Sequence, residues 1–201
     1  MSLDFIYLAS ESPRRRELLQ QIGVPFRVLE AAVDESVLKG ESCEAYVTRL
    51  AAAKVDAGWE SNPEVHRAPV LAADTAVVLD GRILGKPTDR PDGEGMLRQL
   101  SGRTHVVLTA VALRTAGGRR AKLSRSEVTF RALAEQEIRA YWESGEPSDK
   151  AGGYAIQGRA AVFISELRGS FSGVMGLPLF ETAELLRDAG VAHWQSTGPA
   201  R

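Results

Sequence analysis

The amino-acid sequence predicts an α/β protein built on a mixed β-sheet with flanking helices. Two observations support this fold class. Short apolar runs alternate with helical periodicities in the first third of the chain, and apolar runs joined by glycine turns dominate its middle. With 201 residues and 44% hydrophobic content, the chain is long enough for one sizeable core. We therefore expect a single domain over residues 1–190, folded as one unit or as two lobes around a cleft.

The first elements alternate between strand and helix. The run FIYLA, residues 5–9, is apolar and predicts a buried strand. Ser12 and Pro13 then supply an N-cap and a first helical residue, and the helix ends near Gly23. PFRVLEAAVDES predicts a second strand and a loop, and residues 42–59 have helical spacing.

The remaining elements are dominated by hairpins, with helices between them. Residues 68–87 predict a buried strand, a loop and a hairpin that turns at Asp80-Gly81. The later elements are a short helix over 92–102, a long strand over 104–115, its hairpin partner over 122–133, a helix over 134–145, two strands within 153–170 and a closing helix over 176–190. Residues 191–201 lack periodicity, so we expect a disordered C-terminal tail.

Composition restricts the compartment and the partners. The 25 basic and 26 acidic residues nearly cancel, which argues against a broad nucleic-acid or membrane-binding surface. The single cysteine, Cys43, excludes an intramolecular disulfide and favours a reducing compartment. The N-terminal run lacks the basic start of a signal peptide, and no run has the length of a membrane span. We expect a cytoplasmic protein with no nucleic-acid or membrane partner.

Common nucleotide and metal motifs do not match. GRILGKP has three residues between its glycines where a P-loop has four, and Pro87 replaces the Ser or Thr that binds magnesium. GEGMLR lacks the third glycine of a dinucleotide fingerprint. The three histidines are far apart and show no zinc spacing, and no Gly-x-Ser-x-Gly elbow is present.

Three consecutive arginines follow the first predicted strand. They occupy the first turn of the predicted helix, where their charge opposes the helix dipole. A solvated basic turn is one interpretation of Arg14, Arg15 and Arg16. An anion bound at the helix N-terminus is the other, because it would interact favourably with both the dipole and the guanidinium groups.

Several polar residues stand at the ends of apolar segments or inside them. Asp74 and Thr75 interrupt an apolar run, where a carboxylate is costly unless it is paired, bound to metal or facing a cleft. A structural Asp turn is the alternative for Asp74. Other such residues are Lys86, Asp149, Lys150 and Gln157. Together these are the residue types that bind metals, phosphates and base edges.

An ordered series of motifs resembles the Maf family of nucleoside triphosphate pyrophosphatases, also called septum-formation inhibitor proteins. The series is LASESPRRRELL, VDE, AADTAVVLDG, LGKP, LSGRTHVVLTAV, GEPSDKAGGYAIQG and GSFSGVMGLPL, and it spans about residues 3–187. The resemblance implies a strongly curved mixed sheet with a cleft between two lobes, like that of inosine triphosphatases, often in a homodimer. It also implies hydrolysis of the α–β phosphoanhydride of a nucleoside triphosphate, dependent on Mg²⁺, Mn²⁺ or Co²⁺.

The same resemblance assigns roles to residues at matching positions. Asp74 resembles the catalytic acid/base carboxylate and a metal ligand, and Asp34 matches its acidic partner near the metal. The positions that contact phosphate in the family are Ser10, Arg14, Arg15, Lys54 and Lys86. The positions linked to choice of base are Arg14, Thr75 and Gln157.

The motif GGYAIQG resembles the branch of the family that acts on dTTP and UTP. The branch that acts on 7-methyl-GTP usually has Ser-Glu-Gly in place of residues 156–158. Gln157 offers a donor and an acceptor, which match the N3–H and carbonyl edge shared by thymine and uracil, whereas a glutamate offers acceptors only. Chemistry and resemblance therefore both predict a pyrimidine substrate.

Other functions remain as alternatives. The family's older name suggests a nucleotide-binding regulator of cell division or septum formation, which would need no carboxylate placed to activate water. A pyrophosphatase of 7-methyl-GTP, or of inosine or xanthosine triphosphate, would share the reaction and differ in the base. The acidic residues Asp34 and Asp74 together with Lys86 favour an enzyme.

Overall fold

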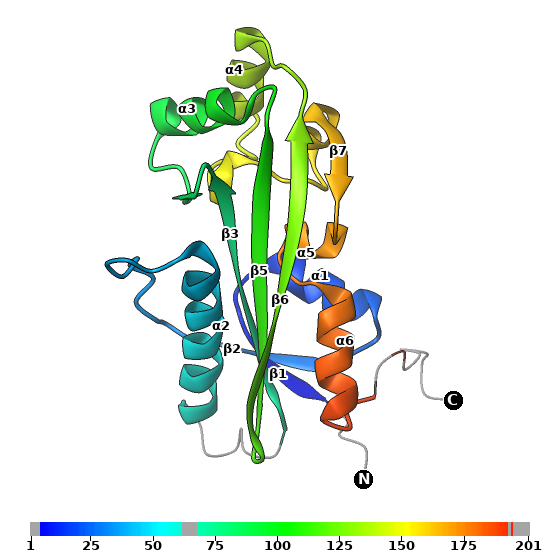
Figure 1. The fold of residues 1–201 in the computed structure, drawn as a ribbon. Helices are drawn as coiled ribbons and strands as arrows, with labels where there is room; N and C mark the ends of the chain where they lie inside the picture. The colour runs from blue at the N-terminus through cyan, green and yellow to red at the C-terminus, as the bar shows by residue number, and fades with distance from the viewer. Residues whose placement is uncertain (1–4, 62–67, 193, 195–201) are drawn as a thin grey trace. The chain divides into compact units, whose positions relative to one another are not determined.

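The fold is a mixed seven-stranded sheet with flanking helices, as the sequence predicts (Figure 1). This computed structural model describes residues 5–61, 68–192 and 194. Neighbouring strands follow the order β2-β1-β3-β5-β6-β7, with β4 paired to β3. The strands are β1 (Ile6–Ala9), β2 (Phe26–Leu29), β3 (Val70–Leu79), β4 (Arg82–Leu84), β5 (Thr104–Thr115), β6 (Gly118–Phe130) and β7 (Ile164–Arg168). The α-helices are α1 (Pro13–Gln21), α2 (Cys43–Glu60), α3 (Arg90–Leu100), α4 (Glu135–Glu143), α5 (Phe171–Met175) and α6 (Leu179–Asp188).

The described residues group into two compact units. Those of the first fall within Met1–Asp74, Thr109–Leu123 and Gly176–Arg201, and those of the second within Thr75–Leu108 and Ser124–Met175. Strands β3, β5 and β6 each contribute residues to both units. Each unit is described below by itself.

The first unit is organised around β1, a short strand that pairs in parallel with two neighbours. On one side Ile6 pairs with Phe26 of β2, and on the other side Tyr7 pairs with Val70 of β3. All four residues of β1 are buried, as the apolar run FIYLA predicts. Helix α1 connects β1 to β2, and α2 lies between β2 and β3 in the chain, which is the connection that parallel strands require.

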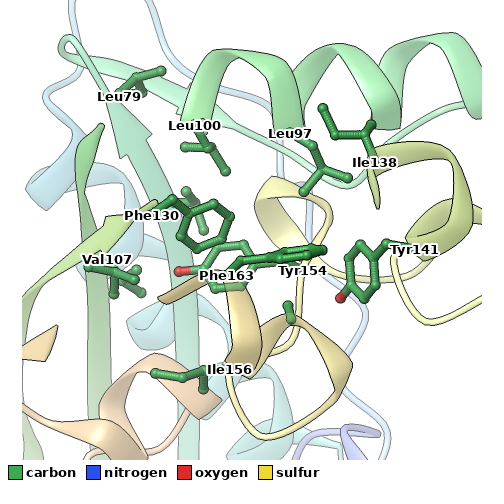
Figure 2. Close-up of a cluster of buried hydrophobic side chains, with 13 residues drawn as sticks. Leu79, Leu97, Leu100, Val107, Phe130, Ile138, Tyr141, Tyr154, Ile156 and Phe163 are labelled. Atoms are coloured by element: carbon green, nitrogen blue, oxygen red, sulfur yellow. The ribbon is translucent and has the colours of Figure 1, made fainter. Parts of the chain in front are cut away.

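The second unit has its own aromatic core (Figure 2). Phe130 at the end of β6 packs edge-on against Tyr154, with ring centroids 4.9 Å apart. Phe163 packs edge-on against Tyr141 of α4 at 5.2 Å. Helices α3 and α4 lie side by side over this cluster (Figure 1). Other members of the core are Val77, Leu79, Leu97, Leu100, Val107, Val128, Ile138, Ile156 and Ala160.

The predicted hairpin turn at Asp80-Gly81 is confirmed. Both residues have positive φ, 50° and 72°, which suits a two-residue turn between antiparallel strands. Strands β5 and β6 are likewise neighbours joined by two residues, so the predicted long hairpin is confirmed, although β6 starts at Gly118 rather than near Lys122.

Two predictions of local structure were wrong. No loop interrupts the apolar run at Asp74, because β3 continues from Val70 to Leu79 with Asp74 inside it. Residues 153–170 contain one strand rather than two. The first part of this segment forms a turn and a 3₁₀ helix, Arg159–Phe163, and the strand follows as β7. The segment is not extended there because Tyr154 and Phe163 both pack in the aromatic core.

Most of the predicted C-terminal tail lies outside the described residues. Val191 is buried, and the amide of Trp194 donates to the carbonyl of Ile22 at 2.7 Å. Within the part of the chain that the structure describes, none of the helices combines the length and apolar character needed to cross a membrane.

Candidate functional site

The junction between β1 and α1 holds one arginine of the triplet in a fixed position. Pro13 opens α1 and Ser12 is its N-cap, with no side-chain hydrogen bond to cap the first turn. The Arg15 guanidinium donates to Ser10 Oγ at 3.0 Å and, through Nε, to the carbonyl of Gly176 at 2.8 Å. These bonds fix the guanidinium beside the N-terminal turn of the helix, where an anion is favoured.

Asp74 is a buried carboxylate in the middle of β3. It is 7% exposed, and its Oδ1 accepts from Lys54 Nζ at 2.7 Å. The same ammonium lies 2.6 Å from Glu35 Oε1. One lysine therefore neutralises two carboxylates, one of them buried in a strand and the other in an exposed loop.

Helix α2 carries Lys54 toward the strands because it packs closely against them. A Cβ added to Gly58 would lie 3.0 Å from Ala9 Cβ and 3.1 Å from Val70 Cγ1, so this glycine permits the close approach. Lys54 stands one helical turn before Gly58 and therefore on the same face. Since Asp74 follows Val70 by four residues along β3, the packing brings ammonium and carboxylate together.

Burial and charge act in opposite directions on this cluster. Burial raises the pKa of Asp74, while the charges of Lys54 and Arg15 lower it and that of Glu35 raises it. Burial lowers the pKa of Arg15, an effect that the Asp74 carboxylate partly offsets. The carboxylate is thus poorly solvated and has cationic partners, an arrangement suited to accepting a proton from a water molecule.

The loop that carries Glu35 is tied to α2. Tyr46 donates its hydroxyl to the Glu35 carbonyl at 3.0 Å, and Arg49 donates to the Ser36 carbonyl at 2.9 Å. Arg49 also forms a bidentate pair with Glu41, at 2.6 and 2.7 Å. Burial, together with the charges of Asp74 and Glu35, raises the pKa of Tyr46, so this hydroxyl stays protonated and keeps its role as donor.

Asp34, the predicted acidic partner of Asp74, has a different contact. Its carboxylate is exposed and accepts from the amide of Ser36 at 2.9 Å, and this bond lowers its pKa. The next residue, Glu35, is the one that contacts Lys54. Sequence reasoning missed this contact because both acidic residues belong to the same VDE motif, and only the path of the loop distinguishes them.

In the second unit, Lys86 is exposed in the loop after β4. The preceding residue, Gly85, accepts a hydrogen bond from the amide of Gly152 at 2.9 Å. Gly152 has φ 69°, and a Cβ there would lie 2.9 Å from both methyl groups of Val77. Only glycine suits position 152. The loop before Lys86 is therefore held by a hydrogen bond to the backbone of a residue that cannot carry a side chain.

Gln157 is exposed on a turn whose neighbours are buried. The amide of Gly158 donates to the carbonyl of Ala155 at 3.1 Å and closes the turn. Tyr154 and Ile156 enter the aromatic core (Figure 2). The Gln157 side chain between Ile156 and Gly158 is exposed. Thr75, which begins this unit's part of β3, is partly buried.

The structure therefore brings four of the predicted residues together in the first unit. These are Ser10, Arg15, Lys54 and Asp74, and Glu35 joins them. Arg14 is partly buried on α1, and its charge acts on Arg15. Asp34 is not brought to Lys54, while Thr75, Lys86 and Gln157 belong to the second unit.

The carboxylates of this cluster suit a divalent cation that also binds the phosphates of a substrate. Within the described residues, no group of three or more His, Cys, Asp or Glu side chains is placed to hold a metal ion. Asp74 and Glu35 provide two carboxylates on one ammonium. Mg²⁺ is commonly held by one or two carboxylates together with substrate phosphates and water, so two carboxylates are sufficient for such a site.

Comparisons with known proteins agree with the motif series. The family model described as Maf-like protein matches residues 5–189. A dTTP/UTP pyrophosphatase of Aromatoleum aromaticum is 56% identical over 199 residues, covering 92% of this chain and 95% of that protein. One of Alkalilimnicola ehrlichii is also 56% identical, over 94% of this chain and 96% of that protein.

Among solved structures, the Staphylococcus aureus Ham1 protein matches with a TM-score of 0.39 and 16% identity, over 65% of this chain and 72% of that chain. This likeness is too low to bear on fold or function. The family model and the curated relatives both cover nearly the whole chain, and the chain belongs to the Maf-like protein family.

Proposed function

We propose that this protein hydrolyses dTTP and UTP to the nucleoside monophosphate and pyrophosphate. The observation that carries the proposal is the buried Asp74 carboxylate, which pairs with Lys54. The charges of Arg15 and Glu35 also act on this carboxylate. Relatives that are 56% identical over more than nine-tenths of the chain bear the name dTTP/UTP pyrophosphatase, which supports the choice of substrate.

In this reaction Asp74 is the general base. Its carboxylate accepts a proton from the water that attacks the phosphorus. Burial raises the pKa of the carboxylate and makes it a stronger proton acceptor, while the charges of Lys54 and Arg15 act in the opposite direction. A binding protein without turnover would have no need for a costly buried carboxylate at this position.

The triphosphate would be held by cations and by the start of α1. Arg15 and Ser10 are already fixed there, and Arg14 and Lys54 add positive charge in the same unit. Guanidinium groups bind phosphate oxygens with two parallel hydrogen bonds, which orients the phosphate as well as attracting it. Lys86 contributes a further phosphate contact in this proposal.

A divalent cation would be held by Asp74 and Glu35 together with phosphate oxygens. When bound, such a cation neutralises phosphate charge and lowers the pKa of water. Asp34, which the sequence assigns to this role, stays a prediction, and the contact of Glu35 with Lys54 supports Glu35 in its place. The identity of the cation, Mg²⁺, Mn²⁺ or Co²⁺, is part of the proposal.

Choice of base would depend on Gln157, with Thr75 and Arg14. The amide of Gln157 offers the donor and acceptor that match the N3–H and carbonyl of thymine and uracil. Its exposed position on a turn with buried neighbours leaves the side chain available for that contact.

A panel of triphosphates tests the proposed function. The purified protein is incubated with dTTP, UTP, 7-methyl-GTP, ITP and XTP in the presence of each cation, and products are separated by chromatography. We expect dTMP and UMP with pyrophosphate, from dTTP and UTP in preference to the purine substrates. Release of orthophosphate and a diphosphate would show that a different bond is cleaved, and full activity in EDTA would exclude the cation.

Two further expectations follow from the resemblance and are part of this proposal. We expect a homodimer, which light scattering on the eluting protein measures directly. We expect a cytoplasmic location, which fractionation of cells that produce the protein tests.

A further inference from the structure

The turn that carries Gln157 is held by one acidic side chain, Glu146. Its Oε2 accepts from the amide of Arg159 at 3.0 Å, and its Oε1 accepts from the amide of Ala160 at 3.5 Å. The carboxylate thus binds the backbone just after the turn. Glu146 precedes Gln157 by eleven positions in the chain, and no part of the proposed reaction uses it.

Glu146 also reaches the start of the turn, through Tyr141. The Tyr141 hydroxyl donates to Glu146 Oε1 at 2.8 Å and accepts from the buried amide of Ala155 at 3.1 Å. Tyr141 is 4% exposed and packs against Phe163, so its ring is fixed by the aromatic core (Figure 2). Both ends of the Ala155–Gly158 turn are therefore tied to the same carboxylate.

The chain is shaped so that this carboxylate fits. Helix α4 ends at Glu143, and Gly145 with φ 74° turns the backbone back toward the core, which places Glu146 under the turn. A Cβ on Gly158 would lie 2.3 Å from Glu146 Oε2. The φ of Gly158 is −104°, so a side chain at this position would displace the carboxylate and would not strain the backbone.

These bonds keep Glu146 ionised. Partial burial raises its pKa, but the amides of Arg159 and Ala160 and the Tyr141 hydroxyl outweigh burial and leave the pKa below its ordinary value. Hydrogen bonds to an ionised acceptor are about twice as strong as neutral ones. The turn is consequently held by charge-assisted bonds, although it lies in a loop.

Such rigidity matters for reading a base with an amide. A primary amide offers a donor and an acceptor side by side, so rotated by half a turn it would match cytosine as well as uracil. A backbone held in one place limits where this amide can meet the base, and so limits which base edge it can match.

From this geometry we propose that Glu146, with Tyr141, is a positioning residue for base selection. The carboxylate fixes the Ala155–Gly158 turn so that Gln157 presents one edge to the base, and this selects dTTP and UTP over cytosine nucleotides. The inference rests on the proposed function, and it adds a residue that does not touch the substrate.

The experiment compares Glu146→Gln with wild type in kcat/KM for dTTP and for dCTP. Glutamine keeps the volume and one acceptor for Tyr141, but turns an NH₂ group toward the amide of Arg159. We expect the dTTP to dCTP ratio to fall about five- to tenfold, the size of one ordinary hydrogen bond. The ratio is unaffected by the amount of folded enzyme, and the change should appear in KM for dTTP more than in kcat.

Glu143→Gln is the matched control. It removes the same charge three residues earlier, from a carboxylate that pairs with Arg90 and not with the turn. Its ratio should equal that of wild type. Tyr141→Phe, which removes the hydroxyl between Glu146 and the amide of Ala155, should lower the ratio in the same direction as Glu146→Gln.

A double variant separates positioning from a general structural effect. If Glu146 acts through Gln157, then adding Glu146→Gln to Gln157→Ala should leave the ratio of Gln157→Ala unchanged. An unchanged ratio in Glu146→Gln, or fully additive effects in the double variant, would overturn this inference while leaving the proposed function intact. A wild-type protein that does not hydrolyse dTTP would overturn the proposed function and this inference together.

Discussion

The two polar regions of the molecule are built on opposite principles. In the first unit, Lys54 pairs with Asp74 and Glu35, so the region depends on side-chain charges placed against one another. In the second unit, Glu146 and Tyr141 bind backbone amides, so the region depends on a fixed main chain. Charges that act on phosphate serve any triphosphate, whereas a fixed turn distinguishes one base edge from another.

This difference has a measurable consequence. Every nucleoside triphosphate carries the same phosphates, so substitutions in the first unit's cluster should change the rate for all substrates by a similar factor. Substitutions in the turn should change the ratio between substrates and leave the common rate nearly intact. The following predictions are ordered by the size of the expected effect.

The largest effect is expected from Asp74→Asn. This change keeps the shape of the side chain and removes the proton acceptor, so kcat should fall about 10²–10⁴-fold for every substrate. Initial rates with dTTP and UTP measure the loss, and circular dichroism confirms that the variant is folded. A folded variant with full turnover would remove Asp74 from the reaction.

The paired variants Glu35→Gln and Asp34→Asn test which acidic residue acts with Asp74. Glu35 contacts Lys54, and Asp34 contacts the amide of Ser36, so only the first change alters the charge beside Asp74. We expect Glu35→Gln to lower kcat/KM about 10–100-fold, the usual cost of losing a group that orients a metal site. Asp34→Asn should stay close to wild type.

Titration of each variant with Mg²⁺ or Mn²⁺ shows whether the loss is one of cation affinity. A loss in Asp34→Asn with a normal Glu35→Gln would restore the assignment made from the sequence. Equal losses in both variants would mean that the loop, and not one carboxylate, is required.

Gln157→Glu tests the other side of the comparison. A carboxylate would face the base carbonyls without a donor between them, so kcat/KM for dTTP and UTP should fall about 5- to 150-fold, which corresponds to about 1–3 kcal/mol. Activity on 7-methyl-GTP should fall less, or rise. Arg15→Ala and Lys86→Ala are the controls, because they should weaken all triphosphates by a similar factor. Equal losses of dTTP and 7-methyl-GTP hydrolysis in Gln157→Glu would mean that Gln157 does not read the base.

Much of the fold follows from local sequence patterns. Strand β1 and helices α1 and α2 could be predicted because apolar periodicity, Pro13 at the start of α1 and the Ser42 cap of α2 act within a few residues. The turn at Asp80-Gly81 could be predicted because positive φ at two adjacent residues favours this pair. The continuity of β3 through Asp74 could not, because it depends on Lys54, twenty residues earlier.

The site was predicted unevenly for the same reason. Asp74 and Arg15 were proposed from their residue types and by resemblance, and Lys54 by resemblance alone. Glu35 was missed, because its contact with Lys54 depends on how Tyr46 holds the loop. Glu146 lies in the motif GEPSDKAGGYAIQG, but its role was missed because it depends on the Tyr141 hydroxyl and on backbone amides that any residue would supply.

The last prediction concerns the stability of the fold and not a rate, and it involves His105, a buried neutral group in the second unit. His105 is 2% exposed, its Nε2 lies 2.8 Å from the Tyr154 hydroxyl, and its ring packs edge-on against Phe130. Its Nδ1 has no hydrogen-bond partner among the described residues, so a protonated ring would bury an N–H without an acceptor.

Burial lowers the pKa of His105 from 6.5 to about 4. In the unfolded chain, His105 therefore binds a proton below about pH 6.5, whereas in the folded chain it binds one only below about pH 4. The contribution of His105 to stability is complete above pH 6.5 and is lost as the pH falls toward 4, by at most about 1.4 kcal/mol per pH unit.

His105→Gln keeps a polar side chain near Tyr154 but does not titrate. Urea unfolding at pH 7.0 and pH 5.0 should show a larger loss of stability in wild type than in the variant, since the other titrating groups are common to both. The same loss in both proteins would mean that His105 takes up its proton in the folded state and that its burial does not disfavour the charged ring.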